Sequence, residues 1–129
     1  MPSRTFPAWA DSVPAARGYV TDLLQHVPAS LCQTAALLVS ELSTNAIRHA
    51  GVREFAVEVD LSTDEGRVWV GVTDTGTGEP VLRIPSLTSE HGRGLRLVAT
   101  LADRWGARRR RGTLDKTVWF ELTLPVPAH

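Results

Sequence analysis

The spacing of apolar residues along the first third of the chain predicts two helices. Apolar positions recur there every three or four residues, which is typical of amphipathic helices. The first helix would be capped by Asp11 or Ser12 and would run to about His26. The second, longer helix would span residues 31–50 and would be closed by Gly51.

Alternating apolar and polar residues predict strands in most of the remaining chain. One strand is expected on each side of the turn at 64–66, so residues 55–61 and 68–72 would form a hairpin. Residues 105–111 and 117–124 would form a second hairpin. Residues 4–8 predict a short edge strand, since Pro7 suits an edge better than a centre.

Between the two hairpins lie a long loop and a third helix. Residues 74–90 are rich in Gly, Pro, Ser and Thr, and helical spacing returns over 94–103. Strands and helices are therefore grouped rather than strictly alternating. This order favours an α+β two-layer sandwich, with a mixed, mostly antiparallel sheet covered by about three helices on one face. A doubly wound nucleotide fold is disfavoured.

Composition indicates a soluble single domain. The 129 residues suit one domain, and the formal net charge of zero gives no general attraction for nucleic acid or membranes. Cys32 is the single cysteine, so no internal disulfide can form. The start of the chain lacks the layout of a signal peptide, and no apolar run is long enough to span a bilayer. We expect a cytoplasmic protein.

A polar stripe interrupts the second predicted helix. Glu41, Asn45 and His49 are spaced by four residues and therefore lie on one side of the helix, among leucines. An Asn oxygen is a hard ligand that suits Mg²⁺, and a Glu one turn away could deprotonate a hydroxyl group. The alternative is an ordinary solvated helix face.

Two glycine-containing segments follow. Asp74 ends a predicted strand, where its carboxylate could accept a hydrogen bond from an amino group, and Gly76 and Gly78 would let a flat ring approach. The segment 91–94, His-Gly-Arg-Gly, is expected as a loop just before the third helix, whose N-terminus could bind phosphate. The alternatives are an ordinary turn and a glycine-rich helix start; the sequence has no P-loop ending.

In this order the three segments resemble the nucleotide-binding boxes of the ATPase superfamily that includes gyrase, histidine kinases, MutL and heat-shock chaperones, which share the Bergerat fold. Residues 41–50 resemble the N box, 74–78 the first glycine box and 92–95 the second. The run 92–106 and the closing 117–120 further resemble the bacterial anti-sigma-factor serine kinases. The resemblance covers nearly the whole chain.

The resemblance implies a role for each matching position. Asn45 would coordinate Mg²⁺ bridging the phosphates, Glu41 would activate the attacking hydroxyl, and Asp74 would bind the adenine amino group of ATP. Residues 79–91 would form a lid. The other positions assigned to the nucleotide are His49, Gly76, Gly78, Gly92, Arg93, Gly94, Leu95 and Thr117.

Three hypotheses about function follow from the resemblance. The first is a Mg-ATP-dependent serine/threonine protein kinase that phosphorylates an anti-sigma-factor antagonist and otherwise sequesters a sigma factor. The second is an ATP-sensing binding module without catalysis, and the third is a scaffold that has lost ATP binding. Family members also suggest a homodimer. The sequence shows no phosphoacceptor helix, so a complete histidine kinase is not expected.

Overall fold

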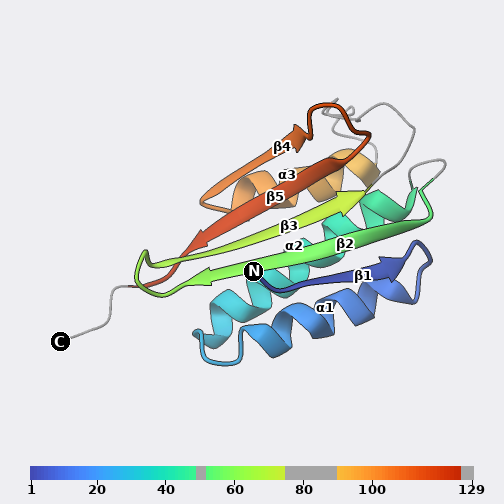
Figure 1. Cartoon of the computed structure of the whole chain (residues 1–129). Helices are drawn as coiled ribbons and strands as arrows, with labels where there is room; N and C mark the ends of the chain where they lie inside the picture. Colours follow the sequence, from blue (N-terminus) through green and yellow to red (C-terminus); the bar gives the residue numbers. More distant parts are fainter. Residues whose placement is uncertain (49–51, 75–89, 126–129) are drawn as a thin grey trace.

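The helices and strands follow the predicted order. The computed structural model describes residues 1–48, 52–74 and 90–125. Within the last of these ranges, side chains are described from residue 96 onward. Two helices, a hairpin, a third helix and a second hairpin follow an initial strand (Figure 1). In chain order the elements are β1 (Ser3–Pro7), α1 (Ser12–Leu23), α2 (Ala29–Arg48), β2 (Glu54–Ser62), β3 (Arg67–Asp74), α3 (Glu90–Leu101), β4 (Arg104–Arg109) and β5 (Lys116–Thr123).

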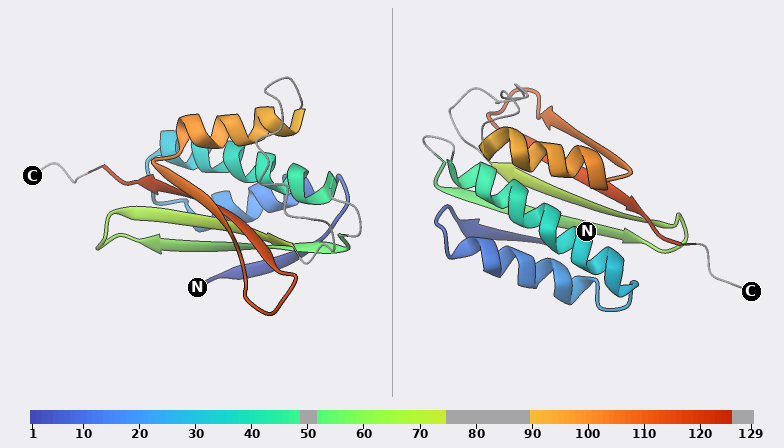
Figure 2. Two further views of the ribbon diagram at one scale, coloured as in Figure 1. Left: turned by 90° about the horizontal axis from the view of Figure 1, so that it is seen from above. Right: turned by 180° about the vertical axis from the view of Figure 1, so that it is seen from behind.

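The strands form one sheet in the order β1-β2-β3-β5-β4. Both predicted hairpins are present, and β3 joins them by pairing with β5. All three helices cover one face of this sheet, as Figure 2 shows from above and from behind. The predicted α+β two-layer sandwich is confirmed. Each strand pair in the described part of the chain is antiparallel, so the sheet there is antiparallel throughout rather than mixed.

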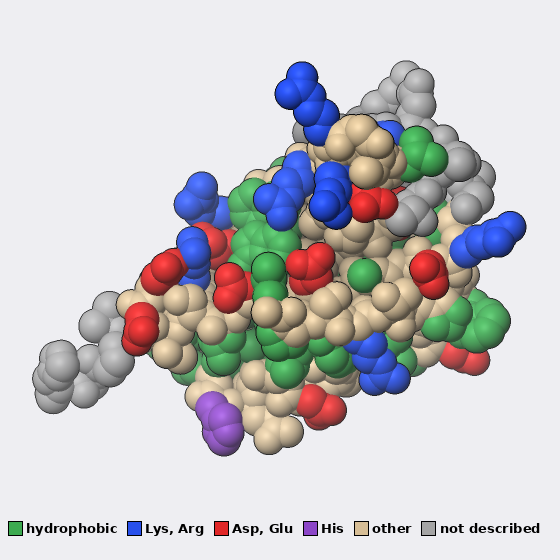
Figure 3. Space-filling model, in the orientation of Figure 1, with side chains coloured by type: hydrophobic (Ala, Val, Ile, Leu, Met, Phe, Trp, Pro, Cys, Tyr) green, Lys and Arg blue, Asp and Glu red, His purple; other side chains and the backbone are tan. Residues whose placement is uncertain are grey.

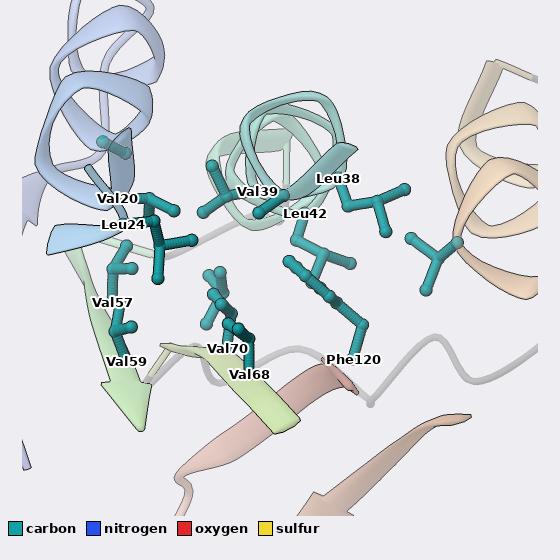
Figure 4. Close-up of a cluster of buried hydrophobic side chains, with 14 of the residues drawn as sticks. Val20, Leu24, Leu38, Val39, Leu42, Val57, Val59, Val68, Val70 and Phe120 are labelled. Carbon is teal, nitrogen blue, oxygen red and sulfur yellow. The ribbon is translucent and has the colours of Figure 1, made fainter. Parts of the chain in front are cut away.

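The core lies between the sheet and α2. Side chains alternate along a strand, so the valines of β2 and β3 and Phe120 of β5 all point toward the helices. They meet Leu38, Val39 and Leu42 of α2 (Figure 4). Phe120 is fully buried, and burying a side chain of this size stabilises the fold by about 1.5–3 kcal/mol. This packing fixes α2 across the middle of the sheet.

The helix boundaries differ from the predicted ones. The first helix ends at Leu23 rather than near His26, and α2 begins two residues early because the Pro28 carbonyl already accepts hydrogen bonds from its first turn. The third helix begins at Glu90, so the segment 91–94, expected as a loop, is helical. A glycine inside a helix costs only about 1 kcal/mol, which is too little to prevent this. None of the described helices is long and apolar enough to cross a membrane.

The outer face of the sheet carries two tryptophans that lie flat on the strands. A Cβ atom on Gly71 would be 2.5 Å from the Trp69 ring, and one on Gly106 would be 2.9 Å from the Trp119 ring. The two indoles stack with centroids 6.3 Å apart. No element of the described ranges covers this face, on which charged side chains surround hydrophobic ones (Figure 3). These tryptophans therefore pack outside the main core.

Candidate functional site

Three chain segments that carry the predicted boxes end at the same edge of the sandwich. The C-terminal end of α2, the C-terminal end of β3 and the N-terminal end of α3 lie together in Figure 1. Strand β5 also begins there, because it runs antiparallel to β3 and pairs Lys116 with Asp74. The topology thus brings together residues that are up to about half the chain apart in sequence.

Glu41 and Asn45 lie on the side of α2 that faces α3. Leu38 points toward α3 in Figure 4, and Glu41 and Asn45 follow it by three and seven residues, so all three share one stripe. Both polar side chains are half-buried rather than fully exposed. A freely solvated helix face therefore does not describe them well.

Asp74 forms a buried ion pair with Lys116. Their side chains are each only 6% exposed, and the Lys116 Nζ lies 3.8 Å from the Asp74 Oδ2. Both residues lie on the face of the sheet that the helices cover, at the edge where α2 and β3 end and α3 begins. Burial lowers the pKa of the Lys116 ammonium from its ordinary value, the attraction of Asp74 opposes this shift, and the nearby Arg109 adds to it.

Sequence reasoning missed Lys116. A signal was available, because Lys116 precedes Val118, Phe120 and Leu122 at the inward positions of the same alternating strand. Lysine is among the residues that are almost never buried without a partner. A lysine at an inward position therefore indicates a specific partner, and the structure identifies Asp74 as one.

Thr117 lies on the other face of the sheet. Its hydroxyl oxygen is 2.6 Å from that of Thr73, the residue directly opposite on β3. The Asp74 carboxylate points to the helix side, so the two side chains are separated by the sheet. The assignment of Thr117 to the adenine side stays a prediction. A hollow of about 390 Å³ adjoins both threonines on this outer face.

The start of α3 offers backbone donors to an anion. The first four N–H groups of an α-helix have no partner within the helix, and the helix dipole adds positive charge there. Gly92 and Gly94 lie in the first turns of α3. The side chains of Arg93 and Leu95 lie outside the described residues, as do His49, Gly76 and Gly78 and most of the predicted lid, 79–91.

The residues present fit magnesium and a nucleoside triphosphate. Mg²⁺ usually takes one or two protein oxygens and completes its shell with phosphate oxygens and water. Among the described residues, no group of three or more His, Cys, Asp or Glu side chains gathers to hold a metal. One amide oxygen of Asn45 beside phosphates is a donor set of the kind that Mg²⁺ accepts.

The antiparallel sandwich carries a half-buried amide, a buried carboxylate and a helix N-terminus at one end, which are groups of the kind that can contact a nucleotide. The family model of the histidine kinase-like ATPase domain matches residues 6–122. The chain belongs to this family, which supports ATP as its ligand. A comparison with curated proteins found no match.

Proposed function

We propose that the chain is a Mg-ATP-dependent serine/threonine protein kinase of the anti-sigma-factor type. The observation that carries this proposal is the meeting of the ends of α2, β3 and α3 at one edge of the sandwich (Figure 1). Membership of the histidine kinase-like ATPase family supports ATP as the phosphoryl donor. The similarity of residues 92–106 to anti-sigma-factor serine kinases supports the protein substrate.

The proposed nucleotide contacts divide among the three segments. Asp74 accepts a hydrogen bond from the adenine amino group, because its buried carboxylate is a strong acceptor. The N–H groups at the start of α3 contact the phosphates, aided by Gly92, Arg93 and Gly94. Asn45 supplies a protein oxygen to Mg²⁺, which neutralises phosphate charge when bound.

Glu41 acts as the general base in the proposed transfer. The substrate serine oxygen forms a bond to the γ-phosphorus, and the bond from that phosphorus to the β,γ-bridging oxygen breaks, releasing ADP. The serine proton passes to the Glu41 carboxylate. Glu41 lies one helical turn before Asn45 on the same stripe, so the base and the metal ligand face the same space. A base in this position typically contributes about 10²–10⁴-fold to the rate.

The proposed partners are proteins. In one state the chain phosphorylates an anti-sigma-factor antagonist, and in the other it binds a sigma factor. A homodimer and a cytoplasmic location belong to the same proposal. Direct binding to nucleic acid or membranes is not part of it, because the formal net charge is zero.

Phosphotransfer to a captured partner tests the proposal. The chain is used to capture proteins from its own source, the captured proteins are incubated with γ-labelled ATP, and phosphoserine is located by mass spectrometry. We expect Glu41→Gln to slow transfer at least about 100-fold while ATP binding persists. Glu58→Gln is the matched control, because Glu58 lies on the outer face of the sheet and lines the hollow there.

Two outcomes would contradict the kinase assignment. Transfer that is unchanged in Glu41→Gln would remove Glu41 as the base. ATP binding without labelling of any captured partner would favour an ATP-sensing binding module, in which the nucleotide only changes the affinity for a partner.

A further inference from the structure

The outer face of the sheet has an aromatic centre. Trp69 of β3 and Trp119 of β5 stack on each other and lie flat over Gly71 and Gly106. Both indoles are half-buried, although no helix or strand of the described ranges covers them (Figure 2). A hollow of about 320 Å³ adjoins the two rings. Tryptophan is enriched where proteins contact each other, and close packing on the two glycines holds these rings in place.

The two borders of this hollow carry opposite charges. Asp60 of β2 lines it on one side, and Arg104 and Arg108 of β4 line it on the other. Lysine and arginine side chains gather toward β4 in Figure 3. Glu121 also lines the hollow, but Arg67 and Arg104 lie 3.5 and 4.0 Å from its carboxylate oxygens and balance its charge. The face thus has an acidic border, an aromatic centre and a basic border.

Asp60 and Arg104 are too far apart to pair within one chain. They stand at the ends of one row of paired residues across the sheet, which runs through Asp60, Trp69, Glu121 and Arg104. Three strand spacings of about 4.8 Å separate them, or roughly 14 Å, whereas an ion pair needs about 4 Å. Among the described residues Asp60 has no ion pair, and Arg104 has the 4.0 Å contact with Glu121 alone. Arg104 is also 71% exposed, so both groups keep the capacity to bind an opposite charge.

A second copy of the chain has the complementary charges at matching positions. A two-fold axis along the strands, between β3 and β5, would lay β2 of one copy over β4 of the other. Such an axis keeps each row in place, so Asp60 would come opposite Arg104 of the second copy, twice in each dimer. The indoles of the two copies would meet at the centre. Glu58, in the next row, would come opposite Gly106 and would make no ion pair there.

We propose that the outer face of the sheet is the contact surface between two copies of the chain, held by the two ion pairs of Asp60 with Arg104 and by the stacked tryptophans. The homodimer comes from the proposed function, on which this inference rests; the surface, the axis and the ion pair are added here. Contact through this face leaves both nucleotide sites open, because α2 and α3 cover the opposite face (Figure 2). Each copy would therefore bind ATP without dissociation of the dimer.

An exchange of charges tests this surface. Sedimentation equilibrium measures the self-association of the wild type, of Asp60→Arg, of Arg104→Asp and of an equimolar mixture of the two variants. In each variant alone, like charges face each other at both contacts, so we expect the dimer dissociation constant to rise at least about 10-fold. In the mixture, one copy of each variant restores two contacts of opposite charge. Dimers should then form again with nearly the affinity of the wild type.

Asp22→Arg is the matched control. Asp22 is exposed on α1, which lies on the other side of the sheet, and this variant makes the same change of charge as Asp60→Arg. The control should dimerise as the wild type does. Recovery in the mixture also excludes misfolding as the cause of the weakened dimers, because two damaged chains would not repair each other.

The outcomes distinguish this inference from the proposed nucleotide site. A monomeric wild type would overturn the inference, and so would a dimer that neither variant weakens, because the contact would then lie elsewhere. Weakening by both variants without recovery in the mixture would overturn the pairing of Asp60 with Arg104. A wild type that dimerises through this face but does not bind ATP would contradict the nucleotide site and leave this surface in place.

Discussion

Removing the charges of Asp74 and Lys116 one at a time and then together should reveal how strongly the two residues are coupled in the folded chain. The single variants are Asp74→Asn and Lys116→Met, and the double variant carries both changes. Each single change leaves one charged group buried beside a neutral neighbour. The double variant leaves neither of the two charged groups in the core, so part of the cost of each single change disappears.

The size of the effect follows from the burial of the pair. Both side chains are 6% exposed, so a charge that loses its partner there is poorly solvated. Losing a charged partner in such a place costs about 1–3 kcal/mol when some other contacts remain. We therefore expect each single variant to lose about this much free energy of unfolding. The double variant should lose less than the sum of the two by at least about 1 kcal/mol.

Urea unfolding of the four proteins without nucleotide, followed by tryptophan fluorescence, measures this coupling. The matched control is the pair of Glu65 and Arg67, whose side chains are 59% and 40% exposed. An exposed ion pair couples by less than about 1 kcal/mol because water screens it. Losses for Asp74 and Lys116 that add within about 0.5 kcal/mol would refute the reasoning.

Three other changes test the fold and the charge of the site. Gly71→Ala should destabilise the chain by about 1–3 kcal/mol in urea unfolding, because its Cβ would lie 2.5 Å from the Trp69 ring. Gly18→Ala should stabilise α1 by up to about 1 kcal/mol, since nothing lies within 4 Å of the added Cβ, and a loss there would contradict the packing. Burial lowers the pKa of Lys116, so the Lys116 amine binds a proton more tightly in the unfolded chain than in the folded chain. The free energy of unfolding should therefore rise with pH between the folded-state pKa and 10.5, and urea unfolding of Lys116→Met should lack that rise.

The sequence predicted the parts of the fold that depend on local pattern. The alternation around Val57, Val70 and Phe120 placed four strands in two hairpins, and the structure confirms both. The grouping of helices and strands predicted the two layers. These features follow from side-chain spacing along a single segment, so no knowledge of distant contacts was needed.

Features that depend on contacts between distant segments were not predicted. The pairing of β3 with β5 joins the two hairpins, and nothing within either hairpin specifies it. Lys116 became meaningful only through this pairing, which places it opposite Asp74. The flat packing of Trp119 likewise depends on Gly106 in a neighbouring strand. Local patterns carry no record of such partners.

The candidate site was predicted in part. Sequence reasoning selected Asn45 and Asp74 as candidate residues, and the structure places the segments that carry them at one edge of the sandwich (Figure 1). The sequence pattern also predicted a loop over 91–94, whereas α3 begins at Glu90. The cost of a glycine in a helix is small enough for the surrounding contacts of α3 to decide its start.

Calorimetric titration of ATP into the chain, with and without Mg²⁺ and beside an Asn45→Ala variant, tests the central claim most directly. We expect the wild type to bind ATP in a Mg²⁺-dependent manner, and Asn45→Ala to lose most of that dependence because the amide oxygen is gone. Absence of ATP binding by the wild type would contradict the nucleotide site at the ends of α2, β3 and α3.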